Sequence, residues 1–481
     1  MDALESTPLL ADSSTTNDDV CSGPYARFTS RRKVALVVLV GWSPSCRLET
    51  VIVAGSFIPA IPQIAKDLDV GAAAVSLAIS VTLISESLGS LVASSYSTFY
   101  GRRPVYLVAL PILCAGSLGV ASSSTITQLL LWRSVQALGM SPGFSVGAGV
   151  VGDLYPAEHR GLAMGAFLGI ALLGPLLAPV VGGYASHYGS WRDMQCGLVG
   201  ASLLTLLILY LDLPETSHTG TTGAYKAREA ADLQGSRPPR FVLINCLRPL
   251  GLLRSPNVLA VVCGTIVTFI MLLIYPQTLA GFCVLTTNFA LLVPINSTIG
   301  DRYDLNAFLI GLCMVPSGLG NIIGAPLAGR LSDKALSRRG GDVLCPEDRL
   351  RATILGAGFL VPLSALSAGL IVQLVPGRLG LALNLLCFFM NGIGVELTLT
   401  PLAAYCIDIL HSRSAEVIAA NSGFRSLLIS LTIGSVVPLI SKLGVIGVGV
   451  LSAGVAWAGF GLICVTICYG KSMRVNVNMD E

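Results

Sequence analysis

The chain has 481 residues, of which 53% are hydrophobic and 12% are charged, and its mean hydropathy is +0.75. Soluble globular proteins carry about 25% charged residues, so this composition excludes a soluble protein and predicts one that crosses a membrane several times. The net charge of +3 gives no reason to expect a nucleic-acid partner. The 13 cysteines form no CxxC pair and no zinc or haem spacing, so no metal site is expected.

A polar tail, residues 1–33, precedes the first apolar segment. It contains Glu5-Ser-Thr-Pro-Leu9-Leu10, which is similar to the acidic dileucine signals that direct membrane proteins to endosomes and vacuoles. Because the first apolar segment starts only near residue 34, the sequence shows no cleavable signal peptide. We expect the protein in the plasma membrane, with the vacuolar or endosomal membrane as the alternative.

A helix that crosses a bilayer needs about 20 apolar residues. On that rule the sequence predicts an all-α protein with twelve transmembrane helices in two sets of six. The N-terminal half, 34–213, and the C-terminal half, 256–470, are joined by a polar linker, 214–255, and followed by a short tail, 471–481. The predicted spans cover residues 34–61, 73–99, 104–123, 126–151, 161–184, 193–213, 257–299, 306–328, 352–375, 379–409, 415–440 and 445–469.

The distribution of Lys and Arg predicts the side of the membrane that each connection faces. If the N-terminus is cytosolic, the tails, the linker and the other connections on that side carry 22 of the 30 basic residues. The external connections carry five, namely Lys66, Arg192, Arg302, Arg378 and Lys442. Both termini are therefore expected in the cytosol.

Two predicted spans are longer than one crossing requires. Residues 255–300 contain no charge and are nearly twice the length of one span, so we expect a long or partly re-entrant segment broken at Pro276 and Pro294. Near its external end, Asn296-Ser297-Thr298 is a glycosylation triplet, although it lies close to the membrane. The first predicted span is also longer than one crossing. Its length does not fix how deep Glu49 lies in the membrane.

The predicted fifth span carries an unusual density of glycine and proline. Such residues destabilise a soluble helix, but in a bilayer the helix persists and small residues let neighbouring helices approach closely. We expect a bend in this span and a helix end at its two last glycines. The span either packs as in any polytopic protein or seals one end of a transport pathway. The residues concerned are Gly169, Gly174, Pro175, Pro179, Gly182 and Gly183.

Several charged residues fall within the predicted spans, where a charge is costly unless it faces the protein interior or a water-filled pathway. Arg133 lies about seven residues into the fourth span; it either takes part in function or bonds backbone carbonyls and locks helices together. A proton-coupled protein also needs an embedded acid. Glu396 is the first candidate, followed by Glu86 and Glu49, and each has a purely structural alternative as a hydrogen-bonded acid.

These features together resemble the major facilitator superfamily and, within it, the fungal twelve-span drug:proton antiporters. The resemblance covers nearly all of residues 34–470, and its most specific element is Gly174-Pro175 with Pro179 and Gly182-Gly183, which is similar to the family's antiporter motif. It implies two six-helix repeats around a midplane site. It also implies an exporter whose fifth span closes the external side.

Two further motifs are similar to those of the family. The first is Gly101-Arg102-Arg103, which resembles the end of a cytosolic loop motif, but Ser94 and Thr98-Phe99 stand where the family has Gly and Asp-Arg. In the family this aspartate bonds to a neighbouring helix and stabilises the outward-open form. Its absence here puts that contact in question for the first half. The equivalent loop of the second half keeps Gly329-Arg330 and Asp333-Lys334. The second motif runs from Leu129 to Gly139 and contains Arg133 and Gln136. The resemblance assigns proton coupling to Arg133.

The expected function is secondary active transport of a small molecule across the lipid bilayer by a monomer. The resemblance implies proton-coupled export of an amphiphilic drug-like compound, secondary metabolite or organic acid, driven by the proton gradient without a cofactor. A proton-coupled importer or facilitator of sugars or organic acids, and a transport-inactive sensor, are the alternatives. No Walker, Ser/His/Asp or HExxH pattern is present, so no enzyme is expected.

Overall fold

The computed structural model describes residues 29–42, 53, 55–155, 157–217, 224–225, 268–337, 346–409 and 414–475. Over these residues the chain forms helices joined by turns, and the described part contains no strand. The predicted all-α class is therefore confirmed. The dileucine sequence, Glu49 and most of the predicted linker lie outside the described residues.

The N-terminal half contains eight described helices. Thr125 caps α6 by accepting a hydrogen bond from the Gln128 backbone N–H, and Pro142 begins α7, where a proline is tolerated in the first turn. Ser190 and Asp193 form a capping box at the start of α9. The helices are α1 (Ser30–Trp42), α3 (Phe57–Asp67), α4 (Ala72–Tyr100), α5 (Arg102–Ala121), α6 (Ile126–Met140), α7 (Pro142–Leu154), α8 (Ala157–Tyr188) and α9 (Trp191–Asp212).

The C-terminal half contains longer helices interrupted by short turns. Gly444 divides α19 into two segments, because its φ of 73° and ψ of 172° are not helical. The elements are α13 (Thr268–Leu292), the π-helical turn η5 (Asn296–Gly300), α14 (Asp301–Tyr303), α15 (Ala307–Ser337), the 3-10 helix η6 (Pro346–Ala352), α16 (Thr353–Leu355), the π-helical turn η7 (Gly356–Leu360), α17 (Val361–Leu374), α18 (Gly377–Ile409) and α19 (Ser414–Val475).

Most helices agree with the predicted spans to within a few residues, but two expectations were wrong. Gly182-Gly183 do not end the fifth span, because α8 continues to Tyr188. Pro276 does not break the seventh span, since it lies inside α13, whereas the helix does end just before Pro294. Both proline-containing helices persist because neighbouring helices cover them, as is usual inside a bilayer.

Eight helical segments of the described part are long and apolar enough to cross a membrane. One of them, Asn421–Tyr469, has 49 residues and contains the non-helical Gly444, so it holds two of the predicted spans. The helices α6 and α7 have 15 and 13 residues, because a turn at Ser141 divides the fourth span. Most residues between α1 and α3 lie outside the described part. The protein is thus a multi-pass membrane protein.

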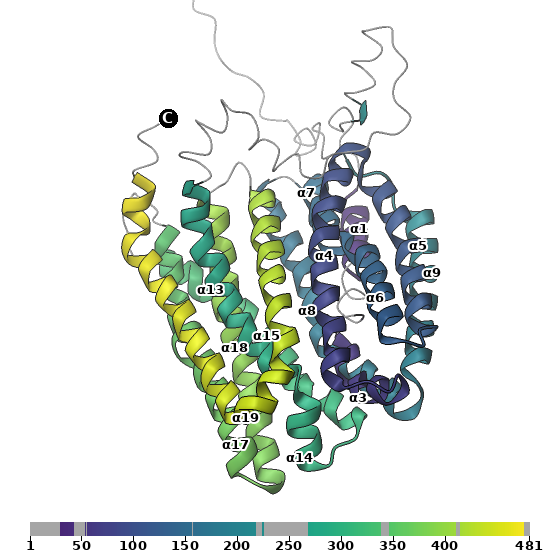
Figure 1. Cartoon of the computed structure of the whole chain (residues 1–481). Helices are drawn as coiled ribbons and strands as arrows, with labels where there is room; N and C mark the ends of the chain where they lie inside the picture. The colour runs from purple at the N-terminus through teal and green to yellow at the C-terminus, as the bar shows by residue number, and fades with distance from the viewer. Residues whose placement is uncertain are drawn as a thin grey trace, which may run out of the picture.

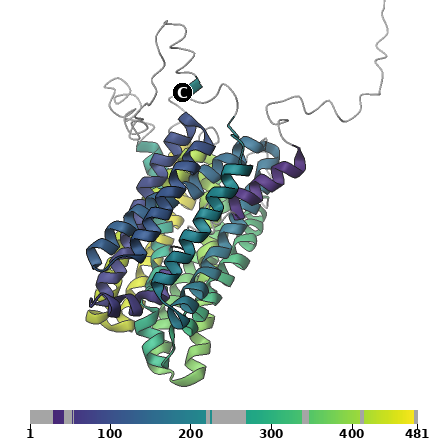
Figure 2. The ribbon, with the colours of Figure 1, turned by 90° about the vertical axis from the view of Figure 1, so that its right-hand side faces the viewer.

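The two halves stand side by side, with the N-terminal half on the right of Figure 1 and the C-terminal half on the left. Figure 2, seen from the N-terminal half, shows that the helices of both halves run in the same general direction. The start of α1 and the end of α19 lie at one end of the bundle, and α3 and α14 lie at the other. We call these the cytosolic and the external end, following the distribution of basic residues.

The buried apolar side chains form one cluster that is shared between the halves and two that are not. The shared cluster lies at the external end and joins, among others, Phe57 and Ile61 of α3 to Ile310 of α15. The other two clusters lie toward the cytosolic end, one built only from the N-terminal half and one only from the C-terminal half. The halves are therefore closed against each other at the external end.

Candidate functional site

The glycine- and proline-rich stretch of α8 forms the closest contact between the two halves. It packs against α15, with Pro179 carbonyl oxygen and Gly183 Cα against Gly311. A Cβ atom added at Gly311 would overlap the Pro179 carbonyl oxygen and lie 3.3 Å from Gly183 Cα. The backbones of the two helices thus touch, which only small residues permit.

The same stretch also contacts the first span within its own half. A Cβ atom added at Gly182 would lie 2.6 Å from Ser56 Cα, just before α3 begins. Nearly two turns earlier on α8, at Leu176, the stretch again contacts the other half: a Cβ atom added at Gly318 of α15 would lie 2.6 Å from Leu176 Cα. The motif predicted to close the external side therefore lies in a tight contact at that side. Gly169 lies in the part of α8 whose side chains are outside the described residues.

A hydrogen bond from Asn296 also joins the halves at the external end. Its Nδ2 donates to the Ile58 carbonyl oxygen at 2.8 Å, and the side chain is half-buried. This is the nitrogen atom that a glycan would modify. In this form of the protein that nitrogen is engaged in a contact between the halves.

Arg133 is completely buried in the N-terminal half, where it starts a chain of polar contacts. Its Nη1 donates to the Val53 carbonyl oxygen at 3.3 Å and to Gln136 Oε1 at 2.8 Å, and its guanidinium lies 4.4 Å from the centre of the Phe57 ring. Its Nε and Nη2 make no hydrogen bond with the described residues. An unsatisfied buried donor of a charged group is costly, which singles out these two nitrogens as a place for a ligand or a mobile acid.

Gln136 extends these contacts to two other spans. Its Nε2 donates to Ser117 Oγ on α5 at 2.8 Å and to Gln195 Oε1 on α9 at 2.9 Å. All three side chains are buried. The network therefore connects the fourth span with the third and the sixth. The sequence indicated Gln136 only as part of the motif around Arg133.

Glu396 lies in the C-terminal half on α18, at the contact with α15 and α19. Thr400, one turn later, donates from Oγ1 to Glu396 Oε2 at 3.2 Å. A Cβ atom added at Gly324 of α15 would lie 3.0 Å from Glu396 Cβ. Arg425 of α19 lies within electrostatic range of the Glu396 carboxylate. Glu396 therefore lies between spans, with an opposite charge on one of its neighbours.

Arg425 is a candidate that sequence reasoning assigned no role. Its Cδ atom would lie 3.3 Å from a Cβ atom placed at Gly281 of α13, so the side chain occupies the space between α13, α18 and α19. The signal in the sequence was a single basic residue in an otherwise apolar span. That signal did not reveal its partner, because Glu396 and Arg425 lie on different helices.

The structure does not bring Arg133 and Glu396 together. Among the described residues, no hydrogen bond or ion pair joins the Arg133 network to the Glu396 and Arg425 pair. Glu86 is half-buried on α4, and α4 packs against α19 of the other half. Glu49, the third candidate acid, lies outside the described residues.

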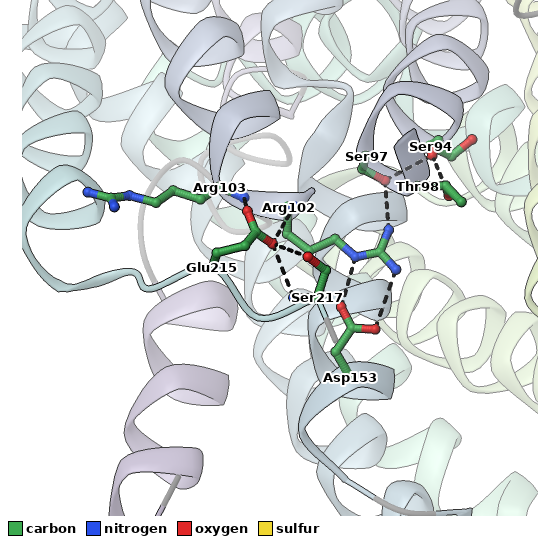
Figure 3. A network of polar contacts seen from close by, with 8 residues as sticks. All are labelled: Ser94, Ser97, Thr98, Arg102, Arg103, Asp153, Glu215 and Ser217. Carbon is green, nitrogen blue, oxygen red and sulfur yellow. Dashed lines mark hydrogen bonds and ion pairs between the residues drawn. The ribbon is translucent and has the colours of Figure 1, made fainter. Parts of the chain in front are cut away.

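The cytosolic end of the N-terminal half is held by a second polar network, shown in Figure 3. Arg102 donates from Nε to Asp153 Oδ2 of α7 at 2.9 Å and from Nη1 to Ser97 Oγ of α4 at 2.8 Å. The side chains of the Arg102–Asp153 pair are only 18% and 15% exposed, so Asp153 is a largely buried partner of Arg102 and not a solvated residue at a helix end.

Glu215 completes this network from the segment that follows α9. Its carboxylate accepts hydrogen bonds from the backbone N–H groups of Arg102 at 2.9 Å and Arg103 at 3.1 Å. These are the first two residues of α5, so a negative charge lies at a helix N-terminus, where it is stabilising. Gly101, with a φ of 104°, makes the turn that brings these groups together.

In place of the aspartate and glycine of the family's loop motif, Thr98 and Ser94 bond within α4. Thr98 donates to the Ser94 carbonyl oxygen and Ser94 donates to the Leu91 carbonyl oxygen. Among the described residues, neither hydroxyl forms a hydrogen bond to another span. The N-terminal half instead uses Asp153 and Glu215 to hold the arginines of the motif.

The equivalent segment of the C-terminal half is helical. The structure places Gly329, Arg330, Asp333 and Lys334 in the last turns of α15, so their prediction as loop residues was wrong. Asp333 forms an ion pair of 2.7 Å with Arg349 of η6, which ties the end of α15 to the start of the ninth span. Arg330 is exposed.

Charged side chains are buried inside apolar helices, and the two halves of the bundle meet at one end. These features are typical of a polytopic transporter. The chain matches the model of the Major Facilitator Superfamily over residues 50–433. It belongs to this superfamily, and the predicted fold is confirmed.

Two relatives and one solved structure illustrate the match. The efflux pump radE of Floropilus chiversii is 27% identical over 442 residues, which cover 87% of this chain and 77% of the relative. Citrate exporter 1 of Aspergillus niger is 32% identical over 196 residues, covering 40% of this chain and 36% of the relative. The crystal structure of the human organic anion transporter MFSD10 (TETRAN) superposes with a TM-score of 0.57 at 17% identity, covering 91% of this chain and all of that one; at this identity the likeness shows the fold alone.

Proposed function

We propose that this protein is a proton-coupled exporter that acts as a monomer in the plasma membrane. It exchanges entering protons for an amphiphilic drug-like compound, a secondary metabolite or an organic acid, and it uses no cofactor. The observation that carries this proposal is the contact of Pro179, Gly182 and Gly183 with α15 and the first span at the external end. Relatives named as an efflux pump and as a citrate exporter support the direction of transport.

The closed external end corresponds to one of the two forms that alternating access requires. In this form the halves share an apolar cluster outside and have separate clusters toward the cytosol, so a solute would enter from the cytosol. Rocking of the halves would separate α8 from α15 and release the solute outside. Glycine-lined contacts suit this motion because they separate without repacking large side chains.

Coupling follows from linkage between the proton and the solute. Two ligands that favour opposite forms of one binding region each weaken the binding of the other. Glu396, with Thr400 and Arg425 beside it, is the acid that we propose to carry the proton. The unsatisfied Nε and Nη2 of Arg133 suit a carboxylate or another anionic group of the solute.

The test is transport by the purified full-length protein in proteoliposomes with an imposed pH gradient, using radiolabelled citrate and an amphiphilic dye. We expect solute movement against the direction of proton flow, lost in Glu396→Gln and Arg133→Ala. The matched control is Arg378→Gln, which removes an exposed arginine at the external end. Unchanged pH-dependent transport in both variants would exclude these roles, and movement of solute with the protons would identify an importer.

A further inference from the structure

A groove with a volume of about 750 Å³ opens at the cytosolic end of the C-terminal half. It lies where α15 ends and the ninth span begins, and it is lined by residues of α15, η6, α16 and η7. It is separate from Glu396 and from the α8 contact, and the proposed transport function does not use it. Its walls combine apolar side chains with charged ones, which is the pattern of an amphipathic ligand site.

The apolar part of the groove continues two stripes of exposed side chains. On α15, Leu319, Ile323 and Leu327 recur every four residues and are exposed. On the ninth span, Leu355 and Phe359 line the groove, and they too are exposed. Exposed apolar side chains on a membrane-spanning helix face the acyl chains of lipids. The groove therefore opens to the hydrocarbon of the bilayer.

The charged part of the groove lies beyond the ends of these stripes. Lys334 and Arg351 line the groove together with one acidic residue, Asp348, so the lining carries a net positive charge. Arg351 pairs with Asp348 at 3.0 Å, and this contact orients the guanidinium while leaving the Arg351 side chain 58% exposed. Two basic side chains thus stand where the apolar surface ends, at the depth of lipid headgroups.

We propose that this groove binds one phospholipid with an anionic headgroup. The acyl chains lie along Leu331, Leu355 and Phe359, and the phosphate is held by Lys334 and Arg351. Charge complementarity favours this occupant over a zwitterionic lipid, and the distribution of basic residues assigns the groove to the cytosolic leaflet, where anionic lipids are concentrated. The bound lipid would connect the end of α15 to η6. The ion pair between Asp333 and Arg349 already connects the same two elements.

The test is native mass spectrometry of the purified full chain in detergent, titrated with phosphatidylglycerol or phosphatidylcholine. We expect one phosphatidylglycerol to be retained in preference to phosphatidylcholine. In the double variant K334Q/R351Q the affinity for phosphatidylglycerol should fall about thirtyfold, since each basic residue near an anionic lipid surface contributes a factor of about five. The control variant R378Q/K442Q removes two exposed basic residues from the external end of the same half and should bind as the original chain does.

A second variant separates the groove from general attraction to basic residues. Ala335 lines the groove, and Ala335→Trp fills it without changing any charge. We expect this variant to lose the bound lipid while keeping its elution volume on a sizing column. Full binding by Ala335→Trp, equal retention of phosphatidylcholine, or complete displacement of the lipid by soluble glycerol phosphate would each overturn the proposal.

Discussion

Gln136 donates a hydrogen bond from Nε2 to Ser117 Oγ at 2.8 Å, which joins the fourth span to the third. The second half repeats this relationship, since Asn391 of α18 donates from Nδ2 to Ser364 Oγ of α17 at 2.9 Å. Each amide is completely or almost completely buried. Both halves therefore have an amide–serine hydrogen bond between equivalent spans. The amide is Gln in one half and Asn in the other.

The amide–serine contact should be worth a measurable amount of stability. Ser117→Ala removes one partner of Gln136, whose Nε2 keeps Gln195 at 2.9 Å, so we expect a loss of about 0.6 to 1 kcal/mol. Gln136→Leu leaves polar atoms of several partners unsatisfied and should cost about 2 to 3 kcal/mol. Unfolding in mixed micelles measures both.

Ser134→Ala is the control for these variants. Among the described residues, the Ser134 hydroxyl bonds only the Leu130 carbonyl oxygen of its own helix, so its removal should change the free energy of unfolding little. Equal losses for Ser117→Ala and Ser134→Ala would show that the contact between the spans contributes nothing of its own.

Closure of the external end should depend on the absence of a side chain at Gly182. Gly182→Leu forces the new side chain into the backbone of Ser56, and overpacking of this kind costs about 1 to 3 kcal/mol. We expect the closed form to become less populated, which would convert coupled export into leak. Reaction of an external cysteine probe with a membrane-impermeant reagent measures the opening.

Gly200 provides the matched control. It lies on α9, is exposed, and a Cβ atom there would meet nothing within 4 Å. Gly200→Leu should leave both transport and probe reactivity unchanged. If Gly182→Leu behaved in the same way, the α8 stretch would be an ordinary packing surface.

The cytosolic network predicts that Glu215 stabilises the N-terminal half. Glu215→Ala removes the acceptor for two backbone N–H groups at the start of α5, and we expect a loss of about 1 to 2 kcal/mol in the free energy of unfolding. Asp212→Asn, three residues earlier at an exposed position, is the control and should be neutral. Thermal unfolding of the detergent-solubilised protein compares them, and equal midpoints would refute the role of Glu215.

A turn at Gly444 separates the last two spans. Replacing this glycine or a helical glycine of α19 with alanine should therefore change the stability of the protein in opposite directions. Gly444 has a φ of 73°, and no atom lies near enough to contact an added Cβ. Gly444→Ala should therefore cost about 1 to 2 kcal/mol, from backbone strain alone.

Gly454 is also free of neighbours but lies within the helix. Gly454→Ala should be neutral or stabilise the protein by up to about 1 kcal/mol, because alanine loses less backbone entropy in a helix. Thermal midpoints that fell equally in both variants would contradict this assignment of the turn.

The predicted spans agreed with the helices because each depends on a local property. A run of about 20 apolar residues must form a helix in a bilayer whatever its neighbours are, so α4, α5, α9 and α18 could be placed from the sequence. The exceptions do not depend on local properties. Whether Gly182-Gly183 or Pro276 ends a helix depends on what packs against it, and that information lies elsewhere in the chain.

By itself the sequence determined the membrane class, the order of the spans and the residues whose charge is energetically costly in a bilayer, among them Arg133 and Glu396. Only the tertiary structure decided their partners. It placed Arg425 beside Glu396, Asp153 and Glu215 beside Arg102, and the Asn296 amide on the Ile58 carbonyl oxygen. The physical reason is that hydropathy is a property of one segment, whereas a charge or a polar atom in the membrane is satisfied by groups on other helices, whose approach no single segment encodes.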